Sequence, residues 1–283
     1  MDVLPSTGRR ARINAAVMAV STLAALVGLV MLVWILGDVS LKGVRSINWA
    51  FFTELPPPPG QDGGGLANAI LGTLILTGVA ALIAVPFGVL AGTYLSEWGK
   101  TSRFGGWVRY VSDILVSAPS IVVGVFVYLV LVKAMGNFSG LAGAVSLAII
   151  MVPVVTRTTE EMLRLVPAEM REATLALGAP YWKMMVGVIY RAAGAGMLTG
   201  ILLAVARVSG ETAPLLFTAL NSPYWTVNLH EPMANLTVTL FNYAMSPYDH
   251  WHDMAWGAAF LITAAVLALT IFSRMLLIKK TSS

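Results

Sequence analysis

Cysteine is absent from the 283 residues of this chain, and charged residues are scarce at 11%. Without cysteine the chain has no disulfide bond and no thiolate metal site. The low charge sets the chain apart from soluble globular proteins, in which about 25% of residues are charged. Hydrophobic residues make up 57% of the sequence. The composition therefore indicates an integral membrane protein, in which only helices or a closed barrel satisfy the backbone.

Sequence patterns of catalysis and cofactor binding are also missing. No G-x-x-x-x-G-K-[ST] loop occurs, so we expect any ATP to be bound by a partner. The three histidines, His230, His250 and His252, match no zinc spacing, and we interpret them as solvated or partner-facing. No apolar segment holds a histidine, a Ser–His arrangement or paired carboxylates. We therefore expect no enzyme activity, no cofactor, no metal and no nucleic-acid partner.

Six long apolar runs predict an all-α polytopic membrane protein. A spanning helix needs about 20 apolar residues, whereas a barrel strand shows an alternating pattern. The predicted spans are 13–36, 67–95, 110–132, 140–156, 192–219 and 254–278. The first run is longer than the core of a signal peptide, and no small-x-small cleavage site follows it. We therefore interpret it as a retained anchor.

The distribution of positive charge predicts the orientation of these spans. Of the 18 lysines and arginines, only Lys42, Arg45 and Lys133 lie in segments that would face outward if the N-terminus is inside. By the positive-inside rule, both termini are predicted to be cytoplasmic. The predicted organisation is a cytoplasmic segment (1–12), a first helix (13–36), an extracytoplasmic loop (37–66), a five-helix core (67–278) with a cytoplasmic loop (157–191), and a cytoplasmic tail (279–283).

Two outer segments have simple interpretations. The sequence LPPPPGQDGGG at 55–65 joins a stiff proline stretch to flexible glycines, and we interpret it as a spacer. Tyr224, Trp225, Tyr248 and Trp251 are expected at the membrane interface, where amphipathic rings are favoured.

The large inner loop at 157–191 predicts short helices on the cytoplasmic face. Thr158 and Glu161 have the spacing of a capping box, so we expect a helix to begin there. Pro167 is suited to the first turn of another helix, Gly178 to a left-handed helix end, and Pro180 to the start of the next helix. The prediction is two short helices joined by a tight turn.

Tyr181 and Trp182 directly follow this turn. Exposed aromatic side chains there are typical of a docking surface for another protein. The alternative is that the loop forms an amphipathic helix on the inner leaflet. The residues by themselves leave both interpretations open.

The segment EATLALG, Glu172 to Gly178, resembles the EAA motif of ABC importer permeases. The pattern there is Glu-Ala-Ala, three residues, then Gly; Thr174 replaces the second alanine, and Tyr190-Arg191 replaces a downstream Leu-Pro. In that family the segment docks onto a cytoplasmic ATPase. The resemblance therefore implies ATPase coupling by Glu172, Ala173, Thr174, Gly178, Ala179 and Pro180.

Two further segments narrow this resemblance. MVPVVTRTTEEMLRLVP and GILLAVARVSGETAPLLFTAL are similar to phosphate importer permeases of the PstA type. The resemblance implies a type I ABC importer permease in the bacterial inner membrane that moves inorganic phosphate into the cell. It further implies a second homologous permease subunit, an ATPase dimer that uses ATP and magnesium, and an extracytoplasmic phosphate-binding protein. The alternative is a permease for another oxyanion or small solute.

Arg207 and Glu211 lie inside the fifth apolar run. Residues four apart share a helix face, so the two charges are expected to neutralise each other. An unpaired charge facing lipid would cost about 3 kcal/mol. Ser209, Gly210 and Thr212, with a proline after them, predict a loosened helix, as in many substrate pathways.

Two interpretations of this charge pair follow. One is an ion pair that only fixes packing between spans. The other is a substrate pathway in which Arg207 binds the anion through its planar fork of donors, with Ser209 and Thr212 beside it. Glu211 is then the orienting partner of Arg207 rather than a direct ligand of the anion. Arg157, at the end of the fourth span, is either a topological anchor or a second anion station. Ser117 and Ser120 flank Pro119 and either offer hydroxyls to an ion or bond to their own backbone.

Overall fold

The computed structural model describes the backbone of residues 7–281 and the side chains of residues 8–275, and this part is helical with no strand. Its elements are α1 (Thr7–Ser46), α2 (Trp49–Thr53), α3 (Ala67–Glu97), α4 (Arg103–Ser117), α5 (Ser120–Val127), the π-helical turn η1 (Tyr128–Val132), α6 (Lys133–Met135), α7 (Gly140–Arg164), α8 (Ala168–Ala176), α9 (Tyr181–Met184), the π-helical turn η2 (Met185–Ile189), α10 (Tyr190–Ser209), α11 (Ala213–Leu216), α12 (Leu236–Ala244) and α13 (Asp249–Thr281).

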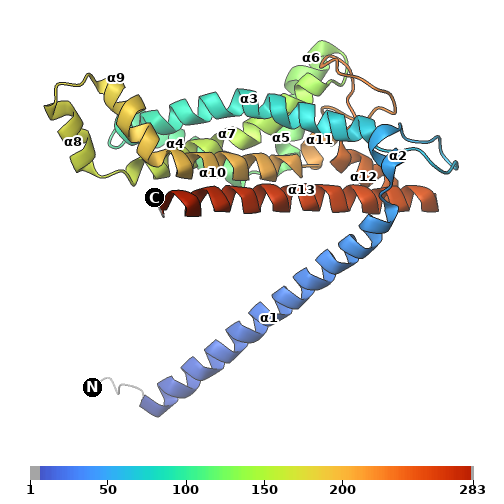
Figure 1. Ribbon diagram of the computed structural model, residues 1–283, viewed down its shortest axis with the longest axis horizontal. Helices are drawn as coiled ribbons and strands as arrows, with labels where there is room; N and C mark the ends of the chain where they lie inside the picture. Colours follow the sequence, from blue (N-terminus) through green and yellow to red (C-terminus); the bar gives the residue numbers. More distant parts are fainter. Residues whose placement is uncertain (1–6, 282–283) are drawn as a thin grey trace.

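The first helix stands apart from the others, as Figure 1 shows. Its spanning segment buries no side chain, and α1 meets α13 only near its own C-terminal end. There the Lys42 ammonium lies 4.4 Å from the centre of the Trp256 ring. In lipid an exposed apolar helix carries no penalty. The expected first span is thus one helix that continues past residue 36.

Among the residues that the structure describes, five helices are long and apolar enough to cross a membrane, and a bent pair brings the number to six if it is taken as one span. That pair corrects the straight span expected at 110–132. The segment Arg103–Ser117 meets Ser120–Met135 at an angle of 104°. The cause is Pro119, which lacks an N–H and forces Ala118 into extended backbone (ψ 137°).

The fourth and fifth spans also differ from their predicted bounds. Helix α7 continues to Arg164, so the helix start expected at Thr158 is wrong. The Thr158 hydroxyl donates to the Val154 carbonyl at 2.9 Å, within the helix, and caps nothing. The helix expected at 192–219 begins earlier, at Tyr181, and ends at Ser209, where Gly210 closes it.

Helices α3 and α7 form the centre of the bundle and approach closely at glycines. A Cβ on Gly88 would lie 2.7 Å from Val155 Cβ, and one on Gly92 would lie 2.5 Å from the Thr156 carbonyl oxygen. Small residues at such points let two backbones approach, which is a common means of helix association in lipid. The two helices therefore pack with almost no side-chain layer between them at these positions.

Substitution Gly88→Leu is expected to lower the free energy of unfolding by about 3 kcal/mol, because Val155 leaves no room for the new side chain. The matched control is Gly78→Leu on the same helix, where a Cβ meets nothing within 4 Å. Thermal unfolding of the full chain in detergent measures both. Equal unfolding temperatures for the two variants would contradict the close contact.

The proline stretch in the loop after α2 does more than space two helices. Pro56 to Pro59 form one wall of a cavity of about 590 Å³ at the end of the bundle away from α8 and α9. Trp251, expected at the membrane interface, lines the same cavity and stacks on Tyr243 at 4.4 Å between ring centres. The loop is held in place because the Gly65 amide donates to the Leu55 carbonyl at 3.0 Å.

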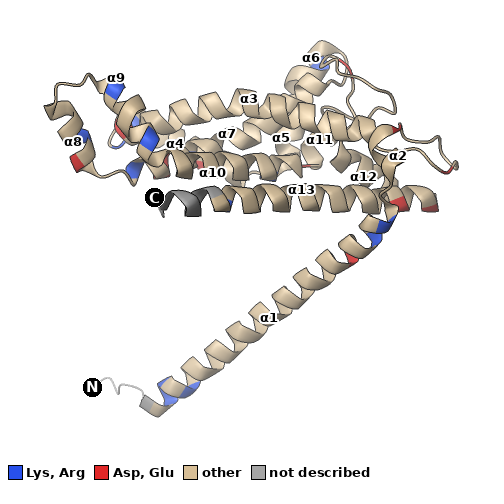
Figure 2. Cartoon of the chain, viewed as in Figure 1, with Lys and Arg blue, Asp and Glu red and all other residues tan. Residues whose placement is uncertain are grey.

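Charged residues gather at the ends of the bundle (Figure 2). Blue lysines and arginines cluster around α8 and α9 and at the start of α1, while the middle of the long helices is almost entirely tan. No group of three or more potential metal ligands occurs in the described residues. Instead, His250 Nε2 lies 2.8 Å from the Gly63 carbonyl oxygen, and His252 Nε2 lies 2.7 Å from the Ser246 carbonyl oxygen.

Candidate functional site

The predicted loosening of the fifth span is a complete break between α10 and α11. Gly210, Glu211 and Thr212 separate the two helices, so backbone groups that a helix would use internally become free. The Glu211 carbonyl accepts a hydrogen bond from the Thr237 hydroxyl of α12 at 2.9 Å. Pro214 of α11 then approaches α5 so closely that a Cβ on Gly124 would lie 2.7 Å from its Cα. The break is therefore held against both α5 and α12.

Arg207 and Glu211 line one small cavity of about 100 Å³ beside this break. Its other walls come from α4, α5, α7 and the link between α4 and α5: Leu115, Val116, Ala118, Ser120, Ile150 and Val154. Five of these six side chains are apolar, but most of the surface that faces the cavity is polar. The volume fits a few water molecules or one small oxyanion.

The expected ion pair between Arg207 and Glu211 does not form. Within the described part of the chain, neither side chain makes an ion pair or hydrogen bond. The prediction assumed a helix running through both residues, but α10 ends at Ser209, so Glu211 does not lie one turn beyond Arg207. The guanidinium thus keeps its donors free at the cavity.

The N-terminus of α5 adds a second attractive element for anions. Helix α5 begins at Ser120, and Pro119 before it gives no side-chain cap. The first amides of a helix lack internal partners and carry partial positive charge, which favours anions. Ser120 lines the cavity, whereas Ser117 donates to the Ile114 carbonyl at 2.9 Å, as its backbone-bonding interpretation predicted. Pro119 was the sequence signal for this helix start.

Ser209 and Thr212 do not join Arg207 in this cavity. The Ser209 hydroxyl donates to the Ala206 carbonyl at 2.8 Å, and the residue lines a different, largely apolar cavity of about 450 Å³ between α3, α10 and α13. Thr212 begins α11 with its backbone, because its carbonyl accepts from the Leu215 amide at 3.1 Å. The structure thus brings together two of the four expected pathway residues of this segment.

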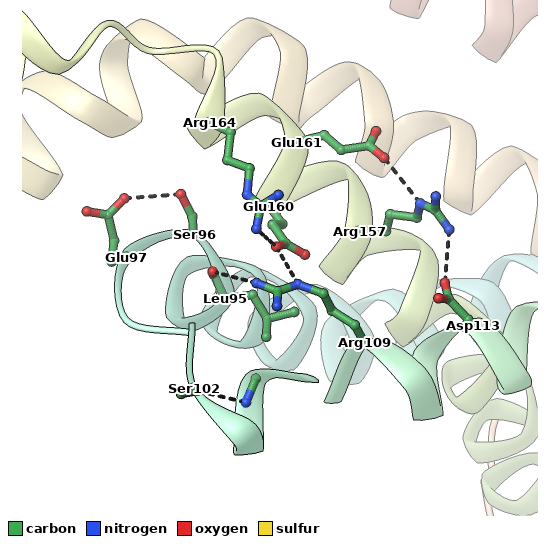
Figure 3. A network of polar contacts seen from close by, with 11 residues as sticks. Leu95, Ser96, Glu97, Ser102, Arg109, Asp113, Arg157, Glu160, Glu161 and Arg164 are labelled. Carbon is green, nitrogen blue, oxygen red and sulfur yellow. Dashed lines mark hydrogen bonds and ion pairs between the residues drawn. The ribbon is translucent and has the colours of Figure 1, made fainter. Parts of the chain in front are cut away.

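Arg157 belongs to a separate charge network at the C-terminal end of α7 (Figure 3). Its guanidinium donates to Asp113 at 3.0 Å and to Glu161 at 3.1 Å. An anion binding at Arg157 would therefore have to displace a carboxylate. Arg157 lines a cavity of about 180 Å³ between α4 and α7.

Glu160 holds the other half of this network. One of its carboxylate oxygens accepts from Arg109 of α4 at 2.8 Å and from Arg164 at 2.6 Å. Glu160 is only 7% exposed, and Arg109 also donates to the Leu95 carbonyl at 3.1 Å. These contacts join α3, α4 and α7. Sequence reasoning missed them, since 51 residues separate Arg109 from Glu160 and no periodic pattern relates them.

The expected coupling loop has the predicted form of two short helices around a turn. Gly178 follows α8 with φ +77°, and Pro180 precedes α9 in extended backbone. Glu172, Ala173, Gly178 and Pro180 are exposed, while Thr174 and Ala179 are half-buried. Helix α8 buries none of its residues, and the Leu177 side chain after it is 88% exposed. An apolar residue so exposed at the tip of a loop is typical of a surface that another protein covers.

A cluster that we call the Glu97 clamp fastens this loop to the bundle, and it consists of Glu97, Arg171 and Tyr181. Arg171 Nη1 of α8 donates to both carboxylate oxygens of Glu97, at 2.5 and 2.6 Å. The Tyr181 hydroxyl of α9 donates to the same carboxylate at 2.7 Å. Arg171 Nη2 also reaches the Leu163 carbonyl of α7 at 2.8 Å. The sequence did not predict this cluster either, because Arg171 and Glu97 are 74 residues apart.

Comparisons with known proteins agree with this geometry. A family model described as "Binding-protein-dependent transport system inner membrane component" matches residues 84–279. The phosphate transport system permease protein PstA of Xylella fastidiosa is 51% identical over 272 residues, which cover 96% of this chain and 94% of that protein. The protein of the same name from Yersinia pestis is 49% identical over 267 residues, which cover 94% of this chain and 90% of that protein.

A solved structure supports the fold. A chain of the MetNI methionine ABC transporter, in an inward-facing conformation, superposes with a TM-score of 0.63 at 19% identity, covering 75% of this chain and 94% of that chain. The helical architecture is thus that of an ABC importer permease. Together with the family match, this shows that the chain belongs to the inner membrane components of binding-protein-dependent transport systems and is a transporter subunit, not an enzyme.

Proposed function

We propose that this chain is the membrane-spanning permease subunit of an ATP-driven importer of inorganic phosphate. The observation that carries the proposal is the unpaired Arg207 guanidinium at a small cavity beside the uncapped N-terminus of α5. Both elements attract anions, and both come from the chain's own fold. The identity of about 50% to proteins named as phosphate transport permeases supports phosphate as the anion.

The roles of the two cavity charges follow from the chemistry of phosphate. Arg207 remains charged at any working pH and offers a planar fork of donors to the phosphate oxygens. Phosphate near neutral pH still carries a proton, so it donates a hydrogen bond as well as accepting several. Because Glu211 does not pair with Arg207, we assign it a direct contact in which it accepts that hydrogen bond and orients the ion. Fully ionised sulfate has no proton to donate to Glu211. Repulsion between Glu211 and the anion is offset by Arg207. Ser209 and Thr212 serve this pathway by ending α10 and starting α11.

Transport proceeds by alternating access in an assembly of several subunits. A protein of this family works with an ATPase and a binding protein. We propose in addition that the second permease is a homologous subunit, that the ATPase is a dimer supplying ATP and magnesium chemistry, and that the binding protein carries phosphate. Arg207 is exposed in the isolated chain, which fits a pathway completed by the second permease. Nothing in the pathway requires a cofactor on this chain.

The coupling residues and the orientation complete the proposal. Glu172, Ala173, Thr174, Gly178, Ala179 and Pro180 present the loop to the ATPase, and the exposed α8 supports this role. Both termini lie in the cytoplasm, as the clustering of lysine and arginine supports. Arg157 becomes a second anion station when movement of α4 releases it from Asp113.

Uptake into vesicles tests the proposed function against a permease for another oxyanion. The assembled transporter, reconstituted with its binding protein, is expected to accumulate radiolabelled phosphate only with ATP present. Excess unlabelled phosphate abolishes the signal, and excess sulfate leaves it unchanged, because sulfate lacks the proton that Glu211 accepts. Equal competition by sulfate would contradict phosphate selectivity and favour the alternative.

A further inference from the structure

The coupling helix α8 has almost no apolar attachment to its own chain. None of its residues is buried, and the loop that contains it projects from the bundle (Figure 1). A helix that buries no apolar face gains little stability from packing. Force applied to α8 therefore reaches the membrane helices through its polar contacts and through the chain itself.

The Glu97 clamp is the polar contact that connects α8 and α9 to the end of α3. The side chains of Glu97 and Arg171 are 6% and 17% exposed, so salt screens their interaction little. The carboxylate accepts from Arg171, from the Tyr181 hydroxyl and from the Ser96 hydroxyl at 3.1 Å. The Tyr181 ring also packs on Trp98, with 5.4 Å between ring centres. Removing one partner of such a pair leaves a buried charge unsatisfied.

Helix α3 is suited to carry movement away from the clamp. Glu97 is its last residue, and Asn68, at its other end, donates to the Ser222 carbonyl at 2.8 Å. Along its length, α3 approaches α7 so closely at Gly88 and Gly92 that neither position has room for a side chain. A displacement of Glu97 therefore moves a helix that runs the length of the bundle.

We propose that Glu97 is a positioning residue for transport, which passes the movement of the coupling loop to α3 through Arg171 and Tyr181. The inference rests on the proposed importer function and deepens it. The competing route is the continuous chain from α9 through η2 into α10, which reaches Arg207 directly. If movement passes through the clamp, breaking the clamp lowers the phosphate taken up per ATP hydrolysed. If movement passes through the α9–α10 chain, this ratio stays the same.

Three variants separate these routes. Glu97→Gln removes the charge, Tyr181→Phe removes one donor but keeps the ring contact with Trp98, and the exchange Glu97→Arg with Arg171→Glu reverses the pair. The control is Asp38→Asn, which breaks the exposed pair with Lys42 in α1 at 2.9 Å. ATP hydrolysis and phosphate uptake are measured in the same vesicles, and the ATPase that copurifies is quantified.

Glu97→Gln is expected to lower phosphate taken up per ATP hydrolysed by about tenfold, the size of an ordinary coupling between sites. Copurified ATPase stays at the wild-type amount, Tyr181→Phe gives a smaller loss, and the exchanged pair recovers part of the ratio. An unchanged ratio, or a parallel loss of uptake, hydrolysis and ATPase, would overturn the proposal in favour of the α9–α10 route or a merely structural clamp.

A second readout is independent of the transported solute. Because this chain has no cysteine, spin labels attach to it only at introduced cysteines, here at the exposed positions Leu90 of α3 and Leu267 of α13, in a complex whose other subunits have been freed of reactive cysteines. We expect ATP to change the distance between these labels in the wild-type background and to leave it unchanged with Glu97→Gln. A distance change that persists in the variant, or none in either, would overturn the inference. If the wild-type vesicles take up no phosphate but the distance result holds, the proposed substrate fails and the clamp remains.

Discussion

Phosphate uptake is expected to fall about 100-fold when Arg207 is replaced by glutamine, the loss typical of removing one partner of a charge pair at an interface. Arg207→Lys retains the charge but loses the planar fork, so an intermediate loss is expected. Glu211→Gln is expected to reduce uptake less and to let sulfate compete. Initial rates in vesicles over a range of phosphate concentrations measure all three variants.

The control for Arg207 is Arg45→Gln at the end of α1, the same change far from the cavity. Its uptake should equal that of the wild type. The amount of assembled complex is compared for every variant, because an assembly defect also lowers uptake. Normal uptake by both Arg207→Lys and Glu211→Gln would refute a role for the cavity in transport.

Glu160→Gln is expected to destabilise the protein by about 4 kcal/mol, because it leaves the arginines on either side of this buried carboxylate without a counter-charge. The neighbouring change Glu161→Gln is a matched control, since that side chain is 57% exposed and its pair with Arg157 contributes at most about 1 kcal/mol. Thermal unfolding of the full chain in detergent compares the two. A similar effect of both substitutions would show that the Glu160 network holds α4 and α7 no more firmly than a surface pair.

The features that follow from local chemistry were predictable from the sequence. Long apolar runs indicated the spanning helices, and Gly178 with Pro180 indicated the turn of the coupling loop, because φ +77° suits glycine and a proline begins a helix well. Arg207 and Glu211 were also singled out, since charges inside an apolar run are costly unless they have a role, and the structure places both at one cavity. Their part in transport stays a prediction.

The remaining features depend on tertiary contacts that no local pattern encodes. Thr158 has the spacing of a cap, yet its hydroxyl bonds within α7, because the helix continues through it. The pairing of Arg171 with Glu97 spans 74 residues of sequence. Pro119 signals a break, but the 104° between the two segments is set by what they pack against. The assumed Arg207–Glu211 pair failed for the same reason, since the exact helix end decides which side chains meet.

The cavity at Arg207 is bounded by two breaks in the helices of the bundle. Ala118 and Ser120 lie on either side of the bend between α4 and α5, and Arg207 and Glu211 lie on either side of the break between α10 and α11. Helices α3 and α7, whose backbones are in close contact at the glycines of α3, form a rigid pair beside these two breaks. Flexing at either break therefore changes the size of this cavity, so that shape changes of the bundle are concentrated at the site that we propose for the ion.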